Sequence, residues 1–150
     1  MARVRVILAA AMLLGAGTAY AKPPIYYPLK APPAERPFSE AVRVGDTLYL
    51  SGQLGADPAT GKLSPDLAVQ TRQAMENIGA TLRKHGLTHD DVFKCTVMLT
   101  DMSHWADFNA VYLTYFKPGR LPARSAFGAA GLALGAQLEL ECWARFPEGK

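Results

Sequence analysis

The number of helices relative to strands constrains the fold more than any other feature of this sequence. Two segments have the apolar spacing of amphipathic helices, and they lie among five strand-like segments in the order β-β-α-β-α-β-β. Two helices can cover only one face of a sheet of this size. The sequence therefore predicts an α+β fold, in which a mixed sheet carries both helices on one face. The other face must be solvated or buried in an oligomer.

The strands are expected at residues 38–44, 47–54, 92–99, 123–130 and 137–146. Gly45-Asp46 has the two-residue length and the leading glycine of a hairpin turn. In the last strand the apolar residues alternate with Glu139, Glu141 and Trp143, so one face is apolar and the other mixed.

The first helix is expected to begin at Ser64-Pro65, where serine can cap free amides, and to end at Gly86. The second is expected to be capped by Asp101 or Ser103 and stopped by Pro118-Gly119. Each has an apolar face. The residues of these faces are Leu67, Ala74, Met75, Ile78 and Leu82 in the first helix, and Trp105, Phe108, Val111, Tyr112, Tyr115 and Phe116 in the second.

The first 21 residues have the three parts of a secretory signal peptide. Arg3 and Arg5 supply positive charge, residues 6–14 are apolar, and Ala19-Tyr20-Ala21 has small residues before a cleavage point. The apolar run is short for a membrane span of ~20 residues, although an uncleaved anchor is the alternative. We therefore expect residues 1–21 to be removed and the mature chain to be periplasmic or secreted, with no membrane attachment.

Prolines recur through residues 22–36, where they fix φ and remove amide donors. This segment is expected to be an extended leader, held to the surface by Tyr26 and Tyr27. The folded domain then covers residues 37–150, a length that suits one domain.

The formal charge of +3 overstates how basic the mature chain is. Without Arg3 and Arg5, 14 basic residues face 13 acidic ones, and no basic run remains. A nucleic-acid-binding surface is therefore not predicted. The 49% content of hydrophobic residues is that of a globular protein.

Cys95 and Cys142 both lie in strand segments, and alternation could place them on one sheet face. In an oxidising compartment the two could form a disulfide. The alternative is a pair of small buried hydrophobic residues. We favour the alternative, because the sequence does not give the Cα separation that a disulfide requires.

Familiar catalytic and metal-binding patterns are missing from the sequence. His85 and His89 lie on either side of Gly86 and do not share a helical face, and His104 is isolated, so no metal site is predicted. There is no nucleophile elbow and no glycine-rich phosphate loop.

One arginine and two acids remain as candidates. Arg124 lies where a loop becomes a strand, and a guanidinium there can bind a carboxylate through two hydrogen bonds. Glu139 and Glu141 share one face of the last strand. If the strand of Arg124 pairs with the last strand through a turn at 131–135, the two charges face one cleft. The residues alone favour an ordinary salt bridge on an exposed sheet face.

Six short segments occur in a fixed order between about Pro37 and Ala144. They are PFSEAV at 37–42, LSGQ at 50–53, DPATG at 57–61, QTRQAMEN at 70–77, VMLTDM at 97–102 and PARS at 122–125. Together they resemble the RidA/YjgF family of reactive-intermediate (enamine/imine) deaminases. The resemblance implies a chorismate-mutase-like α+β fold and a homotrimer. The sheets would pack around a central barrel, with sites in clefts between subunits.

The resemblance also implies a reaction, the hydrolysis of small 2-imino acids to 2-keto acids and ammonia without a cofactor or metal. Arg124 matches the residue that binds the substrate carboxylate, and Glu139 matches the acid that orients the attacking water. Further matched substrate-binding positions are Gly52, Asn109, Phe38 and Ala126. Phe38 stands where many members have tyrosine, and Ala126 stands where many have cysteine.

Two other functions stay open. The chain could be a non-catalytic trimer that binds small carboxylates or acts as a chaperone-like module, since export would separate it from cytoplasmic sources of 2-imino acids. It could also be an endoribonuclease, an activity attributed to relatives, although a mature charge of +1 opposes strong RNA binding.

Overall fold

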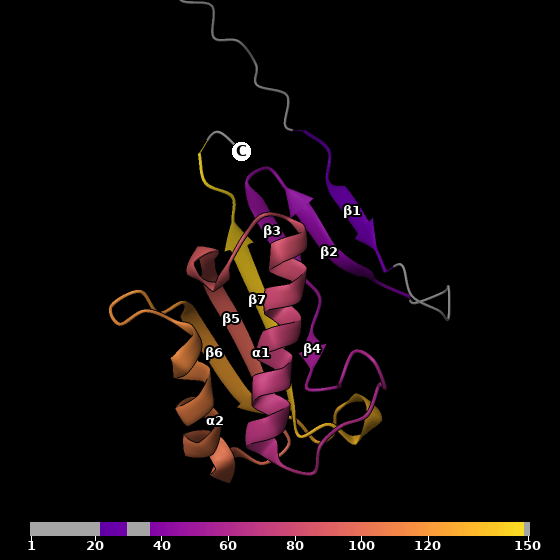
Figure 1. Ribbon diagram of the computed structural model, residues 1–150, viewed down its shortest axis with the longest axis vertical. Coiled ribbons are helices and arrows are strands. Elements are labelled where there is room, and N and C mark those ends of the chain that lie inside the picture. Colours follow the sequence, from indigo (N-terminus) through magenta and orange to yellow (C-terminus); the bar gives the residue numbers. More distant parts are fainter. Residues whose placement is uncertain (1–21, 30–36, 149–150) are drawn as a thin grey trace, which may run out of the picture.

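The computed structural model describes residues 22–29 and 37–148, which form one mixed sheet with two helices on one face (Figure 1). The strands are β1 (Ile25–Pro28), β2 (Ser39–Val44), β3 (Thr47–Leu50), β4 (Gln53–Leu54), β5 (Val92–Leu99), β6 (Ala123–Gly128) and β7 (Leu138–Arg145). The helices are α1 (Leu67–Lys84) and α2 (Trp105–Tyr112). The predicted fold class is confirmed, although the sheet of this single chain is not closed. The predicted signal peptide lies outside the described residues.

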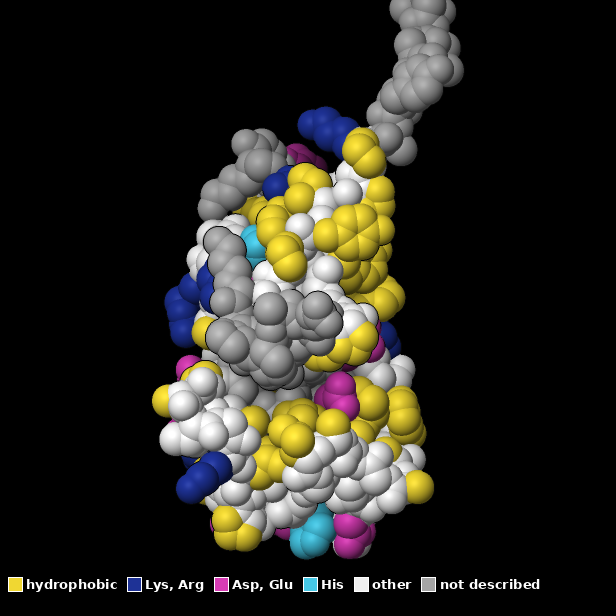
Figure 2. Space-filling view, turned by 90° about the vertical axis from the view of Figure 1, so that its right-hand side faces the viewer, with side chains coloured by type: hydrophobic (Ala, Val, Ile, Leu, Met, Phe, Trp, Pro, Cys, Tyr) yellow, Lys and Arg dark blue, Asp and Glu magenta, His cyan; other side chains and the backbone are white. Residues whose placement is uncertain are grey.

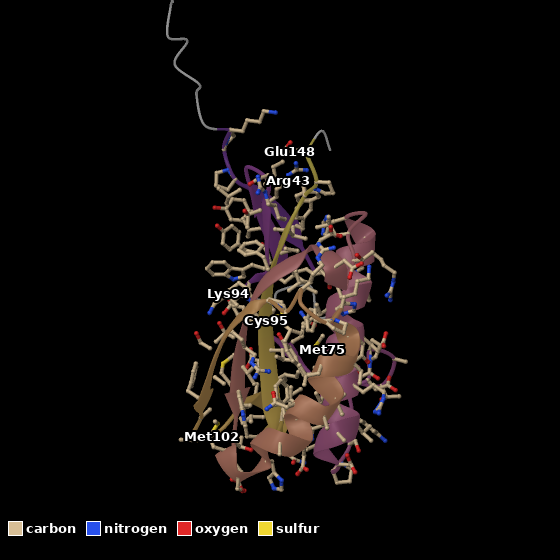
Figure 3. The ribbon with its side chains drawn as sticks, turned by 90° about the vertical axis from the view of Figure 1, so that its left-hand side faces the viewer. Arg43, Met75, Lys94, Cys95, Met102 and Glu148 are labelled. Carbon is tan, nitrogen blue, oxygen red and sulfur yellow. A yellow bond between two sulfur atoms is a disulfide. The ribbon has the colours of Figure 1, made fainter. Side chains whose placement is uncertain are left out.

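The sheet has the order β1-β2-β3-β7-β5-β6, and β4 also pairs with β7. Only β5 and β6 run parallel, because α2 lies in the connection between them. Figure 3 shows the sheet edge-on, with both helices on one side and Lys94 pointing away from them. The mixed face of β7 is thus the face without helices.

The leader contributes a strand to this sheet. Residues 25–28 pair antiparallel with β2, so this part of the leader is extended, whereas residues 30–36 lie outside the described residues. Tyr27 is half-buried and lies 4.3 Å from the ring of His85, whereas Tyr26 is 66% exposed. Figure 2 shows apolar side chains gathered over this part of the molecule, where Ile25 and Val44 are also exposed.

Helix α1 begins two residues later than Ser64-Pro65 predicts. The Asp66 side chain accepts a hydrogen bond from the Val69 amide at 3.0 Å and caps the helix. Ser64 instead accepts from the Asp66 amide, in the turn before the helix. The helix ends at Lys84, and the expected stop residue Gly86 follows two residues later with a φ of 70°, which suits glycine.

The predicted strand 47–54 is interrupted at Ser51-Gly52, which separates β3 from β4. The Ser51 hydroxyl donates to the carbonyl of Ser39 at 2.6 Å, and this bond holds the interruption in place. Both halves still pair with β7, and Leu54 lies opposite Glu139. Gly52 is thereby carried next to β7.

The core lies between the sheet and the helices, and it confirms both predicted apolar faces. Ala74, Met75, Ile78 and Leu82 of α1 are at most 1% exposed, and Phe108 and Tyr112 of α2 at most 2%. Asp101 caps the short 3-10 turn before α2 by accepting from the Ser103 amide. No helix in the described part of the chain is long and apolar enough to cross a bilayer.

The interpretation of the two cysteines as separate buried residues is wrong. Cys95 of β5 and Cys142 of β7 lie directly opposite each other and form a disulfide. Both are at most 1% exposed, on the sheet face that carries the helices. The register between β5 and β7 sets this pairing, and the sequence did not give that register.

We expect the disulfide to stabilise the fold. Reduction should lower the free energy of unfolding by about 2–4 kcal/mol, because the bridge joins residues 47 apart and restricts the unfolded chain. Urea unfolding with and without a reductant measures the effect. The double variant Cys95→Ala with Cys142→Ala is the control and should not respond to reductant. Equal stability of the wild type in both conditions would contradict the prediction.

Candidate functional site

The predicted site residues occupy two separate regions of the chain. Phe38, Gly52 and Glu139 line a cavity of about 650 Å³ formed by α1, β4 and the segment before β7. Arg124 lies instead against α2, where it is bonded to Asn109. We call these regions the glutamate cavity and the arginine cradle.

Glu139 projects into the glutamate cavity because Gly52 has no side chain. A Cβ atom at Gly52 would lie 1.9 Å from Oε1 of Glu139. Glu139 is half-buried, and within the described residues it has neither a hydrogen-bond donor nor a cationic partner. Its carboxylate is therefore available to a ligand or to water.

Other polar groups of the glutamate cavity are already bonded. Glu40 accepts from Lys84 and from Thr81, and the Asn77 amide donates to the carbonyls of Leu54 and Ala56. Glu141, the second candidate acid, accepts from the indole of Trp143 at 2.7 Å. Of these three acids, Glu139 is the one that accepts no hydrogen bond from a described residue. Glu40, Thr81 and Lys84 were not predicted as site residues, and only the helical spacing of the last two indicates a shared surface.

In the arginine cradle the guanidinium of Arg124 has no acidic partner among the described residues. Nη1 of Arg124 donates to Oδ1 of Asn109 at 2.8 Å. The guanidinium carbon lies 4.6 Å from the ring centre of Trp105 and 4.7 Å from that of Tyr112. Aromatic faces attract a cation, and they also shield it partly from water. Arg124 forms no ion pair with any described residue, so its charge can bind an anion.

Tyr112 does not compete for that charge. Burial raises the pKa of its hydroxyl to about 12, although the nearby Arg124 acts in the opposite direction. The phenol therefore stays neutral at physiological pH and offers its ring to the guanidinium. From the sequence, Trp105 and Tyr112 were assigned only to the apolar face of the helix. Their aromatic character was the one signal that they could also contact the guanidinium of Arg124.

The expected pairing of the Arg124 strand with the last strand is wrong. β5 lies between β6 and β7, and the segment from 129 to 137 is not a hairpin turn. Arg124 lies opposite Cys95 and shares its face, whereas Glu139 alternates with buried Leu138 and Leu140 and lies on the other face. Within one chain, the guanidinium of Arg124 and the carboxylate of Glu139 therefore lie on opposite faces of the sheet. Ala126 lies two residues beyond Arg124 on the same face, outside the glutamate cavity.

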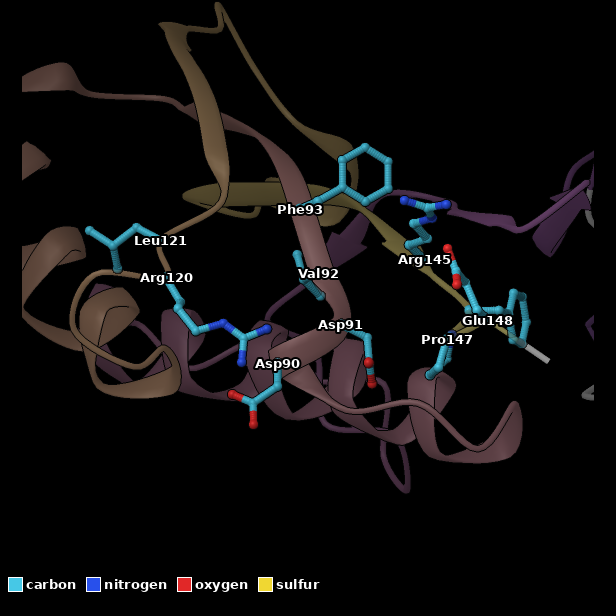
Figure 4. Close-up of a pocket in the computed structure, with 10 residues that line it drawn as sticks. Asp90, Asp91, Val92, Phe93, Arg120, Leu121, Arg145, Pro147 and Glu148 are labelled. Carbon is cyan, nitrogen blue, oxygen red and sulfur yellow. The ribbon is translucent and has the colours of Figure 1, made fainter. Parts of the chain in front are cut away.

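A second cavity, of about 470 Å³, contains none of the predicted site residues (Figure 4). Its charged groups are largely engaged, since Asp90 pairs with Lys117, Arg145 with Asp46, and Asp91 with the amide of Thr88. The described residues also contain no group of three or more side chains suited to a metal ion. We therefore place the candidate site in the glutamate cavity and the arginine cradle.

The comparison with protein families identifies the class of protein. The family model described as Endoribonuclease L-PSP matches residues 28–146, nearly all of the predicted mature chain. The chain belongs to this family, which is the RidA/YjgF family that the sequence motifs resemble.

Curated relatives and solved structures agree with this assignment. The mouse protein named 2-iminobutanoate/2-iminopropanoate deaminase is 44% identical over 75% of this chain and 83% of its own length. The human protein of the same name is 42% identical over 75% and 82%. A crystal structure of RidA from an Antarctic Psychrobacter covers 81% of this chain and 94% of its own, with 37% identity and a TM-score of 0.72. Escherichia coli TdcF with bound serine covers 76% and 91%, with 33% identity and a TM-score of 0.71.

Substitution of two glycines tests whether the Glu139 carboxylate is free to move. At Gly52 a new Cβ meets the flexible end of Glu139, so Gly52→Ala should lower the free energy of unfolding by less than about 1 kcal/mol. At Gly55 a Cβ would lie 2.3 Å from the backbone of Gln70, so Gly55→Ala should cost about 3 kcal/mol or more. Urea unfolding of both variants measures the difference. Equal losses would mean that Glu139 is fixed by the fold.

Proposed function

We propose that this protein hydrolyses small 2-imino acids to 2-keto acids and ammonia. The observation that carries the proposal is a pair of unsatisfied charges in a member of the RidA/YjgF family. Arg124 has no acid and Glu139 has no cation among the described residues. Relatives at 42–44% identity that bear the name of an imine deaminase support the general activity.

Arg124 would bind the substrate carboxylate, and Asn109 would hold the guanidinium in position. Glu139 would accept a proton from a water molecule as its oxygen attacks the carbon of the C=N bond. The resulting carbinolamine loses its amino group as ammonia after that nitrogen is protonated, and the C=O bond forms. One water is consumed for each ammonia released, with no change of oxidation state. An imine is already electrophilic, so positioning supplies much of the catalysis.

We propose further that each site is completed between two copies of the chain in a homotrimer. One copy would supply the arginine cradle and its neighbour the glutamate cavity, because a single chain holds them on opposite sheet faces. The face without helices supports association, since Phe127 is 49% exposed there and Tyr49 and Trp143 form a ring pair at 4.8 Å. Exposed aromatic side chains are typical of protein interfaces.

The protein is also proposed to be exported. Residues 1–21 have the pattern of a signal peptide, and the Cys95–Cys142 disulfide is of the kind that persists in oxidising compartments.

The family description favours one alternative function, endoribonuclease activity. Ribonuclease activity that follows the protein through a sizing column and is lost in Arg124→Ala would favour that alternative.

Three variants test the catalytic roles. Imines are generated from small amino acids by an amino-acid oxidase, and their decay is followed with the purified mature chain. Arg124→Ala should lower kcat/KM at least about a hundredfold, because the carboxylate loses its cation. Arg124→Lys should retain part of the activity, since it keeps the charge but not the planar fork. Glu139→Gln should mainly lower kcat, since it cannot accept a proton. An Arg124→Ala variant as fast as wild type would refute the mechanism.

Mixing two inactive variants tests the site between copies. Arg124→Ala and Glu139→Gln chains are unfolded together at equal amounts and refolded, so that mixed trimers form. About a quarter of the sites then combine an intact arginine from one copy with an intact glutamate from its neighbour, and activity should return to that extent. Each variant refolded alone is the control. No recovery in trimers shown to be mixed would place the whole site within one copy.

A further inference from the structure

Leu134 combines two features that are unfavourable for a leucine. Its φ of 58° and ψ of 14° place it in the left-handed region, and it is the one residue other than glycine with positive φ in the described part of the chain. Bulky side chains rarely adopt this conformation. The side chain is also 74% exposed, so packing within the chain does not offset the strain.

The backbone around Leu134 is held by the fold. The amide of Gly135 donates to the carbonyl of Leu132, and that of Ala136 donates to Ala133. Gln137 then attaches the segment to the start of α1, because its amide donates to the side chain of Gln70 at 3.0 Å. Leu134 is thus presented at a defined place. Strain that is retained in this way is typical of ligand-binding sites.

Leu134 lines the glutamate cavity together with Glu139 and Phe38. The other acids of this cavity are engaged, since Glu40 pairs with Lys84 and Asp57 accepts two backbone amides. Leu134 and Phe38 thus place apolar surface in the same cavity as Glu139, which accepts no hydrogen bond from a described residue. If the reacting carbon of a substrate lies next to Glu139, the side chain of that substrate would lie close to Leu134 and Phe38.

We infer that Leu134 is a specificity-determining residue that contacts the substrate side chain. The enzyme would then prefer 2-imino acids with branched aliphatic side chains over the one derived from alanine. This inference rests on the proposed function, because it assumes that Glu139 marks the reacting end of the substrate. Apolar contact with additional methyl groups supplies the preference.

The test compares kcat/KM for the imines of leucine and alanine in the wild type and in Leu134→Gly. Glycine adopts the left-handed conformation freely, so this variant should fold as well as the wild type. The wild type should have the higher kcat/KM for the leucine-derived imine. In the variant, the ratio of kcat/KM for the leucine-derived imine to that for the alanine-derived imine should fall about tenfold. Leu113→Ala is the control, since Leu113 is exposed outside the cavity and its loss should leave the ratio unchanged.

Three results would overturn the inference. The first is a wild type without the preference, and the second is a Leu134→Gly variant with the same ratio as the wild type. The third is a Leu134→Gly variant whose oligomeric state on a sizing column differs from the wild type, which would make Leu134 an assembly contact.

Binding of the product keto acids separates this inference from the proposed function. Dissociation constants for 4-methyl-2-oxopentanoate and pyruvate are measured by calorimetry with the same three proteins. If the wild type hydrolyses no imine yet binds the branched keto acid more tightly through Leu134, the deaminase proposal fails, and only the contact between Leu134 and the ligand side chain is retained. If it neither hydrolyses the imines nor binds the keto acids, both fail.

Discussion

The antiparallel pairing of β5 with β7 determines where both charged groups of the candidate site lie. Cys95 faces Cys142 and Met98 faces Glu139 in this register, so the disulfide is on the helix-covered face and Glu139 on the opposite one. The parallel pairing of β6 with β5 then sets Arg124 beside Cys95, under α2. A shift of one residue in β7 would bury Glu139 in the core and expose Leu138 and Leu140. The apolar alternation of β7 therefore fixes the register and the location of the acid together.

Most of the local structure could be predicted because it depends on residues that are close in sequence. The alternation in β7, the apolar faces of both helices and the glycine that ends α1 each express a period or a backbone preference. Errors of a residue or two arose where two local signals competed. Both Ser64 and Asp66 can cap a helix, and the structure uses Asp66 because Ser64 forms a turn with it.

The long-range pairings could not be predicted, since no local pattern specifies which strand lies beside which. This is why the Cys95–Cys142 disulfide and the position of β5 between Arg124 and Glu139 were missed. Arg124 and Glu139 were candidates from the residues themselves, and the resemblance to a family added the other four. Five of the six lie in the glutamate cavity or the arginine cradle. The motifs did not include the residues that surround Arg124. Its aromatic neighbours Trp105 and Tyr112 had been assigned to the apolar face of the second helix and therefore to the core.

The separation of Arg124 from Glu139 within one chain has a chemical advantage. A guanidinium and a carboxylate on adjacent strands of one sheet would form an ion pair, and a substrate would then have to break it before binding. Here Asn109 and two aromatic rings hold the arginine without neutralising it, and the absence of a side chain at Gly52 leaves room for the glutamate. Neither charge forms an ion pair with another described residue. A substrate carboxylate that binds the arginine leaves the glutamate free to act on water, which the proposed hydrolysis requires.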